Sequence, residues 1–199
     1  MASTVKTSTY RQLQAQQTKD RIADAARRLF AEQGYKSTSM EAIAAEAGVA
    51  VRTVYSAYGA KREILSAICE KWLEDADARG LAARTLAEPD PKKRLRAAAH
   101  WLRNLYDHGF DVVTVFEAAG DEDEETRSML RAKLKGRNHV MDSIIASLQG
   151  GLTKSTRDAQ AIYRAFAAPG VYRELVLETG WTSEAFEDWV ADALIQQLL

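Results

Sequence analysis

Apolar residues recur every three or four positions along almost the whole chain, the spacing of one face of an α-helix. No stretch alternates apolar and polar residues in the way of a half-buried strand. The first strong segment starts at Thr18 and ends at Gly34, and its apolar positions share one helix face: Ile22, Ala25, Ala26, Leu29 and Phe30. We therefore predict an all-α fold.

Two short helices follow the first one. The spacing predicts a helix from Met40 that stops at Gly48, with Thr38 and Ser39 available as caps, and a second that begins at Val51 and stops before Gly59. The order is long helix, short helix, tight turn, short helix. We assign 18–60 to this domain and expect 1–17, which are rich in Ser, Thr and Gln, to form a flexible arm.

Longer helices are predicted beyond Ala60. Asp90 is suited to cap a helix that begins at Pro91, because proline is favoured at the first helical position. The predicted spans are 61–84, 91–108, 111–119, 122–149, 155–167, 171–179 and 183–199.

Composition is that of a compact protein with a core. The 199 residues are 46% apolar and 28% charged, which excludes a disordered or disulfide-scaffold chain. Residues 1–65 hold ten Lys and Arg against six Asp and Glu, while the remainder holds 17 against 22, so the first third is suited to a polyanion. No apolar block resembles a signal peptide or a membrane span, and we expect a cytoplasmic protein. The single cysteine, Cys69, is predicted to lie in the core.

The sequence offers no arrangement typical of catalysis. His100, His108 and His139 lack metal-ligand spacing, and there is no phosphate-binding glycine loop or nucleophile elbow. The acidic run 121–125 is better explained as a solvated helix start than as a metal site. We predict that the protein is not an enzyme and needs no cofactor or metal.

The turn through Gly48 makes residues 40–58 a candidate helix-turn-helix, in which the second helix enters the DNA major groove. On that helix Val51 and Val54 face inward, and Tyr55 lies at the margin. Arg52, Thr53 and Ser56 face outward, and together with Tyr55 they can contact bases and phosphates. A helical hairpin with an incidental polar face is the alternative.

The stretch RIADAARRLFAEQGYKSTSMEAIAAEAGVAVRTVYSAYGAKREIL, residues 21–65, resembles the N-terminal domain of the tetracycline-repressor (TetR) family of bacterial transcription regulators. The end of the chain, from Pro169 to Asp192, looks like a C-terminal pattern of some of these regulators, whereas residues 66–160 match no pattern. The resemblance implies a homodimeric, operator-binding repressor with an effector-binding and dimerisation domain over 61–199, released by a small apolar ligand. An activator, a ligand-independent regulator, and a helical interaction module or enzyme without specific DNA binding remain alternatives.

The resemblance also implies site residues. Thr38, Ser39, Tyr55 and Lys61 would hold phosphates, while Arg52, Thr53 and Ser56 would lie nearest the bases. Ala50 and Ala57 depart from the family pattern: the first lacks a capping hydroxyl, and the second shortens the reach toward bases.

Two further sets of residues are candidates within 61–199. Aromatic and polar positions that can converge on a ligand are Trp72, His100, Trp101, Asn104, Phe110 and Phe116, with Arg103 and Tyr106 nearby. Apolar positions that suit a dimer interface are Ile162, Phe166, Tyr172, Phe186, Trp189, Val190 and Leu194. Both sets could instead fill the core of one chain.

Overall fold

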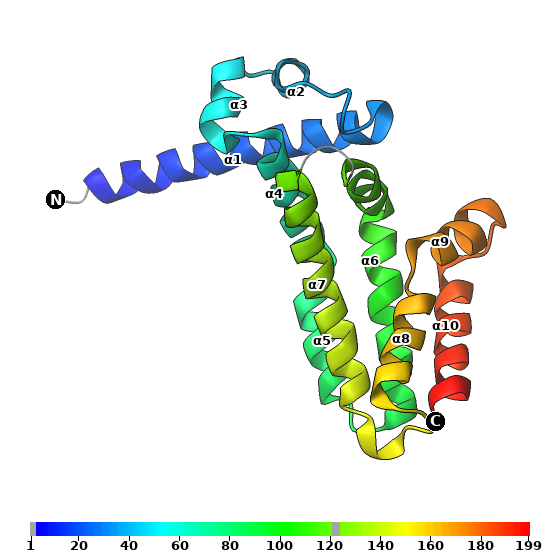
Figure 1. Ribbon diagram of the computed structural model, residues 1–199. Helices are drawn as coiled ribbons and strands as arrows, with labels where there is room; N and C mark the ends of the chain where they lie inside the picture. Colours follow the sequence, from blue (N-terminus) through cyan, green and yellow to red (C-terminus); the bar gives the residue numbers. More distant parts are fainter. Residues whose placement is uncertain (1–2, 121–123) are drawn as a thin grey trace. The chain divides into compact units, whose positions relative to one another are not determined.

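The computed structural model describes residues 3–120 and 124–199, and these residues form helices and connecting turns without a strand. This confirms the predicted all-α class (Figure 1). In chain order the helices are α1 (Ser3–Gln33), α2 (Met40–Ala47), α3 (Val51–Tyr58), α4 (Lys61–Asp75), α5 (Ala78–Ala87), α6 (Pro91–Ala119), α7 (Glu124–Ala146), α8 (Thr156–Phe166), α9 (Pro169–Tyr172) and α10 (Ser183–Leu198). A 3-10 turn, Gln149–Gly151, follows α7, and a π-helical turn, Arg173–Glu178, follows α9.

The chain divides into two compact units. The first comprises residues up to 71 together with 114–127, and the second comprises 72–113 together with 128–199. The helices α4, α6 and α7 each contribute residues to both units.

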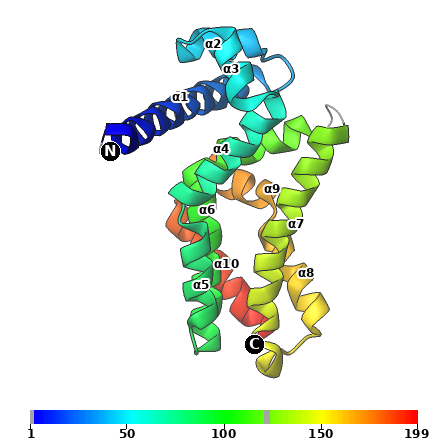
Figure 2. The ribbon, with the colours of Figure 1, turned by 90° about the vertical axis from the view of Figure 1, so that its left-hand side faces the viewer.

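In the first unit, α2 and α3 lie along one side of α1 (Figure 2). The large apolar side chains of its core are at most 2% exposed and include Ile22, Phe30, Ile43, Val54, Ile64 and Leu65. The apolar face expected for each short helix is the face that packs inward.

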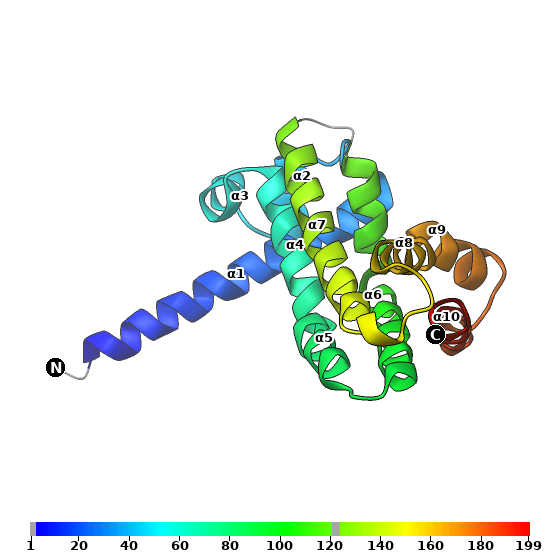
Figure 3. The ribbon, with the colours of Figure 1, turned by 60° about the horizontal axis from the view of Figure 1, so that its bottom comes forward.

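In the second unit, α7 and α8 run side by side (Figure 3), and Gln160 of α8 donates a hydrogen bond to the Asp142 carbonyl of α7 at 3.1 Å. The helix α10 lies next to α8. The largest fully buried side chains of this core are Leu95, Leu102, Leu105, Met141, Ile144, Tyr163 and Phe186.

The first helix begins earlier than predicted. Helix α1 starts at Ser3 and not at Thr18, so the expected flexible arm is helical where it is described. No proline or glycine interrupts residues 3–33, and two hydrogen bonds along the helix support it: Gln14 donates to the Tyr10 hydroxyl at 3.0 Å, and Thr18 donates to the Gln14 carbonyl at 2.9 Å.

The helix predicted over 61–84 is two helices. The helix is interrupted at Asp77, which has φ 44, a left-handed conformation that Asp tolerates better than most residues. Two side chains of α6 bind carbonyls at this break: Asn104 donates to Ala76 at 2.5 Å, and Trp101 donates to Ala78 at 2.9 Å. These long-range bonds explain why local spacing did not reveal the break.

The helices predicted over 91–108 and 111–119 are the two arms of α6, which meet at a kink at the non-helical residue Gly109. A Cβ at Gly109 would lie 2.4 Å from Cδ1 of Trp72, so only glycine allows this approach. The N-terminus of α6 matches the prediction: Asp90 accepts a hydrogen bond from the Lys93 amide at 2.8 Å, and the helix begins at Pro91.

The remaining boundaries shift by a few residues. Helix α7 ends at Ala146, and of the acidic run 121–125 only Glu124 and Glu125 lie within the described residues. Cys69 is 3% exposed, which confirms its place in the core. None of the described helices is both long enough and apolar enough to cross a membrane.

Candidate DNA-binding surface and effector domain

The turn between α2 and α3 is fixed by backbone geometry. The Ser39 hydroxyl caps α2 by accepting a hydrogen bond from the Ala42 amide at 3.1 Å. Gly48 has φ 64, a left-handed conformation that favours glycine, and the next amide, that of Val49, donates to the Ala44 carbonyl at 3.0 Å. The sequence therefore places both ends of α2 correctly.

Two side chains that are not among the predicted site residues hold the helix-turn-helix together with α1. Arg21 donates to the Ala47 carbonyl at the end of α2, at 2.6 Å. The Tyr58 hydroxyl, at the end of α3, donates to the Lys19 carbonyl at 3.0 Å. Burial, followed by the charges of Asp20 and Asp24, raises the pKa of Tyr58 to about 12, so its hydroxyl stays a donor at neutral pH.

Helix α3 presents a polar face to solvent. Val54 is fully buried beneath the helix, whereas Arg52, Tyr55 and Ser56 are exposed and Thr53 is half-buried. None of these four polar side chains makes a hydrogen bond or ion pair with another described residue. Ala50, at the N-cap, provides no side-chain hydrogen bond, as its lack of a hydroxyl predicts.

The structure gives Thr38 and Lys61 roles inside the first unit. Thr38 is 2% exposed and donates to the Gly34 carbonyl at 2.9 Å. The Lys61 ammonium donates to the Tyr35 carbonyl at 2.7 Å and to the Thr38 carbonyl at 3.2 Å, and it lies 4.3 Å from the centre of the Tyr35 ring. These contacts use donors that a phosphate would need, so Thr38 and Lys61 have structural roles in the first unit. Their expected contact with phosphates stays a prediction.

A helix-turn-helix that is capped, anchored to the preceding helix and open on its second helix has the geometry of a major-groove reader. Residues 22–68 match the family model described as bacterial regulatory proteins, tetR family. Residues 22–68 therefore belong to the TetR family of bacterial regulatory proteins. The match ends within α4, so the greater part of the chain lies outside the family model.

Relatives extend the likeness beyond the first unit. The regulator is 29% identical over 148 residues to the fatty acid metabolism regulator protein of Bacillus subtilis (strain 168), an alignment that covers 70% of this chain and 72% of that protein.

Two solved structures share the fold. FadR of Bacillus subtilis in complex with stearoyl-CoA matches with a TM-score of 0.72 and 20% identity, over 90% of this chain and 98% of that one. NalD, the secondary repressor of the MexAB-OprM multidrug efflux pump in Pseudomonas aeruginosa, matches with a TM-score of 0.73 and 18% identity, over 94% and 98%.

The predicted ligand residues do not form one group. Trp72 and Trp101 are buried, and their indole nitrogens donate to carbonyls of Leu105 and Ala78 at 2.8 and 2.9 Å, so both serve as core residues. Phe116 belongs to the first unit, whereas the other five candidates belong to the second. Phe110 is half-buried, with its ring centre 5.0 Å from that of Tyr172.

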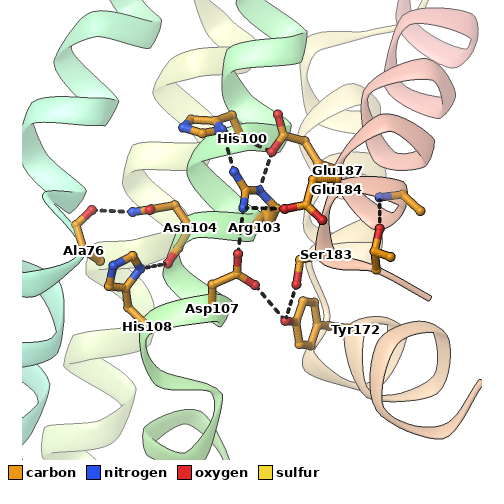
Figure 4. A network of polar contacts seen from close by, with 12 residues as sticks. Ala76, His100, Arg103, Asn104, Asp107, His108, Tyr172, Ser183, Glu184 and Glu187 are labelled. Atoms are coloured by element: carbon orange, nitrogen blue, oxygen red, sulfur yellow. Dashed lines mark hydrogen bonds and ion pairs between the residues drawn. The ribbon is translucent and has the colours of Figure 1, made fainter. Parts of the chain in front are cut away.

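Polar side chains of α6 and α10 form a network in the second unit (Figure 4). Arg103 donates to Glu187 at 2.5 Å and to Asp107 at 2.8 Å, and Nδ1 of His100 lies 3.1 Å from Glu187. Burial by itself lowers the pKa of Arg103, but the hydrogen bonds and charges of Glu187 and Asp107 raise it above its ordinary value. The Tyr172 hydroxyl donates to Asp107 at 2.9 Å. His100 and Arg103 are therefore engaged in joining α10 to α6.

The predicted dimer stripe divides into two parts. Tyr172, Phe186, Val190 and Leu194 are at most 4% exposed within a single chain, so they belong to its core and their assignment to the interface was wrong. They are buried because α10 packs against α6 and α8 of its own chain, as the aromatic contact between Tyr106 and Phe186 indicates. The other three members are Ile162, Phe166 and Trp189, of which Trp189 is 36% exposed and has its ring centre 5.4 Å from that of Phe166.

Metal ligation finds no support in the described part of the chain, where His, Cys, Asp and Glu form no group of three able to hold an ion. Nδ1 of His108 lies 2.8 Å from the Asn104 carbonyl of its own helix.

Proposed function

We propose that this regulator is a homodimeric repressor that binds a palindromic operator through α3 and leaves it when a small apolar ligand binds within residues 61–199. The observation that carries the proposal is the exposed polar face of α3 on an anchored helix-turn-helix. In this proposal residues 18–60 form the DNA-binding domain, and the protein works in the cytoplasm and without catalysis.

Arg52 is proposed to read a base. It is exposed in the first turn of α3, and a guanidinium can bond guanine through two donors. Thr53 and Ser56 are proposed to lie beside the bases, while Tyr55 and Ser39 are proposed to contact phosphates, since both are exposed at the same motif.

The partner surface is proposed to be the half-exposed apolar residues of α8 and α10. Ile162, Phe166 and Trp189 remain accessible in the single chain, and Trp181 lies 6.3 Å from Trp189 between ring centres. An apolar cluster of this kind suits a two-fold contact between like surfaces, which would place two copies of α3 on two half-sites.

The effector is proposed to be a long-chain fatty acid or its CoA ester. Support comes from the sequence relative, which is a fatty acid metabolism regulator, and from the FadR structure, which holds stearoyl-CoA. The NalD likeness shows that the same fold occurs in an efflux repressor, so fold alone does not select this class. A ligand that binds better to the DNA-incompetent state must weaken DNA binding, by reciprocal linkage.

Selection of binding sites from random duplexes, followed by gel shifts at several salt concentrations, tests the proposal. Arg52→Ala is expected to cost about 1–3 kcal/mol on the selected site and to relax the base preference. Arg157→Ala, at an exposed arginine of α8, is the matched control and should leave affinity unchanged. Failure to select any sequence, or unchanged affinity of Arg52→Ala, would contradict the proposed reading of DNA.

A further inference from the structure

Arg137 occupies an unusual position on α7. Leu130, Met141 and Ile144 share its helix face by their spacing and are at most 9% exposed, so the row to which Arg137 belongs is the inner face of the helix. Arginine is rarely placed on such a face unless its charge has a partner.

The Arg137 guanidinium lacks that partner in the described chain. Its Nε is enclosed by protein atoms and has no hydrogen-bond acceptor among the described residues, and its Nη2 reaches only the neighbouring Asn138 side chain, at 3.5 Å. An enclosed donor without an acceptor costs about 1–3 kcal/mol.

Other half-buried arginines of the second unit are satisfied. Arg94 donates to the Glu88 carbonyl at 2.7 Å and to the Ser147 carbonyl at 2.8 Å. Arg103 pairs with Glu187, and Arg164 pairs with Asp142. Arg137 therefore differs from these three arginines, whose guanidinium groups have carbonyl or carboxylate acceptors.

Tyr163 on α8 supplies no balancing charge for Arg137. Tyr163 is fully buried and donates to the Ala98 carbonyl of α6 at 2.8 Å. Burial and the nearby Tyr106 raise the pKa of Tyr163, and the positive charge of Arg137 acts in the opposite direction. Because the phenol stays neutral, the charge of Arg137 remains uncompensated by it.

We propose that Arg137 anchors the anionic head of the effector, whose apolar part packs against the surrounding helices. A guanidinium pairs well with two oxygens of a carboxylate or phosphate, and a single charged residue in an apolar site commonly fixes the orientation of a ligand. The inference rests on the proposed effector and names the residue that would hold its anionic oxygen. That oxygen can belong to a free carboxylate or to a phosphate of CoA.

Three probes with the same chain length test the inference: stearate, stearoyl-CoA and octadecan-1-ol, each used below the concentration at which it aggregates. Arg137→Met removes the charge and keeps an apolar stem, and Lys135→Met removes an exposed charge two residues away. We expect Arg137→Met to weaken stearate binding about tenfold or more, the loss expected for a charged hydrogen bond. The affinity of Arg137→Met for octadecan-1-ol should stay within about twofold of the wild-type value. Lys135→Met should change the affinity for neither stearate nor octadecan-1-ol. A loss for stearoyl-CoA alone assigns the anionic oxygen to its phosphates.

Stability provides the second readout. Without a probe, Arg137→Met should unfold at the same denaturant concentration as the wild type or at a higher one, because it removes an uncompensated enclosed charge. The inference would be overturned if Arg137→Met lost equal affinity for stearate and octadecan-1-ol, or lost no affinity for either stearate or stearoyl-CoA. It would also be overturned if the wild type bound none of the three probes. Operator binding by the same samples separates the two proposals. A wild type that binds its operator but none of the probes refutes the anchor and the proposed effector class, and leaves the proposed reading of DNA standing.

Discussion

The position of Lys61 in the sequence predicts a contact with DNA phosphate, whereas its contacts in the structure stabilise the fold of the first unit. Its ammonium has three donors, and the carbonyls of Tyr35, Lys36 and Thr38 accept them at 2.7, 3.4 and 3.2 Å. The end of α1 and the start of α2 are thus tied to the first residue of α4.

Lys61→Met should therefore destabilise the protein. We expect the free energy of unfolding to fall by about 1–3 kcal/mol, because partly buried carbonyls lose a charged donor. Lys36→Met, at an exposed lysine of the same turn, should leave it unchanged. Urea unfolding measures both variants, and a Lys61→Met protein of wild-type stability with a reduced salt dependence of DNA binding would return Lys61 to the phosphate-contacting set.

Tyr58 predicts a loss of stability at alkaline pH. The folded state holds the pKa of Tyr58 at about 12, above the ordinary value of 10.0, so the unfolded chain releases this proton first as pH rises. The stabilisation is complete below pH 10 and is lost as pH rises toward 12.

Tyr58→Phe should lower the free energy of unfolding at pH 8, because the hydrogen bond to the Lys19 carbonyl is lost. Between pH 8 and pH 11 the free energy of unfolding of this variant should fall less steeply than that of the wild type. Urea unfolding at the two pH values provides the comparison, with Tyr55→Phe as the exposed control. If the wild type and Tyr58→Phe lose the same stability over this pH range, burial of the Tyr58 hydroxyl does not cause the alkaline loss of stability.

At the scale of elements, two glycines on long helices should respond oppositely to the same substitution. A Cβ at Gly136 of α7 would meet no atom within 4 Å, so Gly136→Ala should stabilise the helix by about 0.5–1 kcal/mol. A Cβ at Gly109 would lie 2.5 Å from Nε1 of Trp72, which bonds the Leu105 carbonyl, so Gly109→Ala should destabilise the protein by about 1–3 kcal/mol. Thermal unfolding measures whether each variant is more or less stable than the wild type. Unfolding midpoints that shift in the same direction for both variants would contradict the proposed role of Gly109.

The predictability of the elements follows from how local their causes are. Helices α2 and α3 end at glycines, and α2 begins directly after Ser39, whose capping ability is visible in the sequence, so these bounds could be predicted. The break at Asp77 depends on Trp101 and Asn104, which are distant in the chain, and spacing could not reveal it. The kink at Gly109 lies in the gap between the helices predicted over 91–108 and 111–119, although the close approach to Trp72 is visible only in the structure.

The candidate site was predictable to the same degree. The outward set on α3 follows from helical periodicity, and the structure exposes Arg52, Tyr55 and Ser56. The apolar stripe of α10 could not be divided between core and interface, because periodicity reports that a face is apolar and not which surface covers it. Arg137 did carry a sequence signal, a charge in an apolar row, that the search for catalytic groups did not use.

At the scale of the whole molecule, assembly is expected to decide DNA affinity. Trp189→Glu places a charge in the half-exposed aromatic cluster and should give a monomer that binds the operator far more weakly, because one α3 makes half of the contacts. Glu184→Gln, at an exposed position of the same helix, is the control. Light scattering and gel shifts check both effects, and a Trp189→Glu protein that remains a dimer would place the interface elsewhere.

The central claim is that one ligand-linked equilibrium controls DNA binding, and operator affinity measured with and without saturating stearoyl-CoA tests it most directly. The account predicts that the ligand raises the operator dissociation constant and that saturating operator raises the stearoyl-CoA dissociation constant by the same factor, typically about 5–150. An operator affinity that stays unchanged while stearoyl-CoA binds would contradict it.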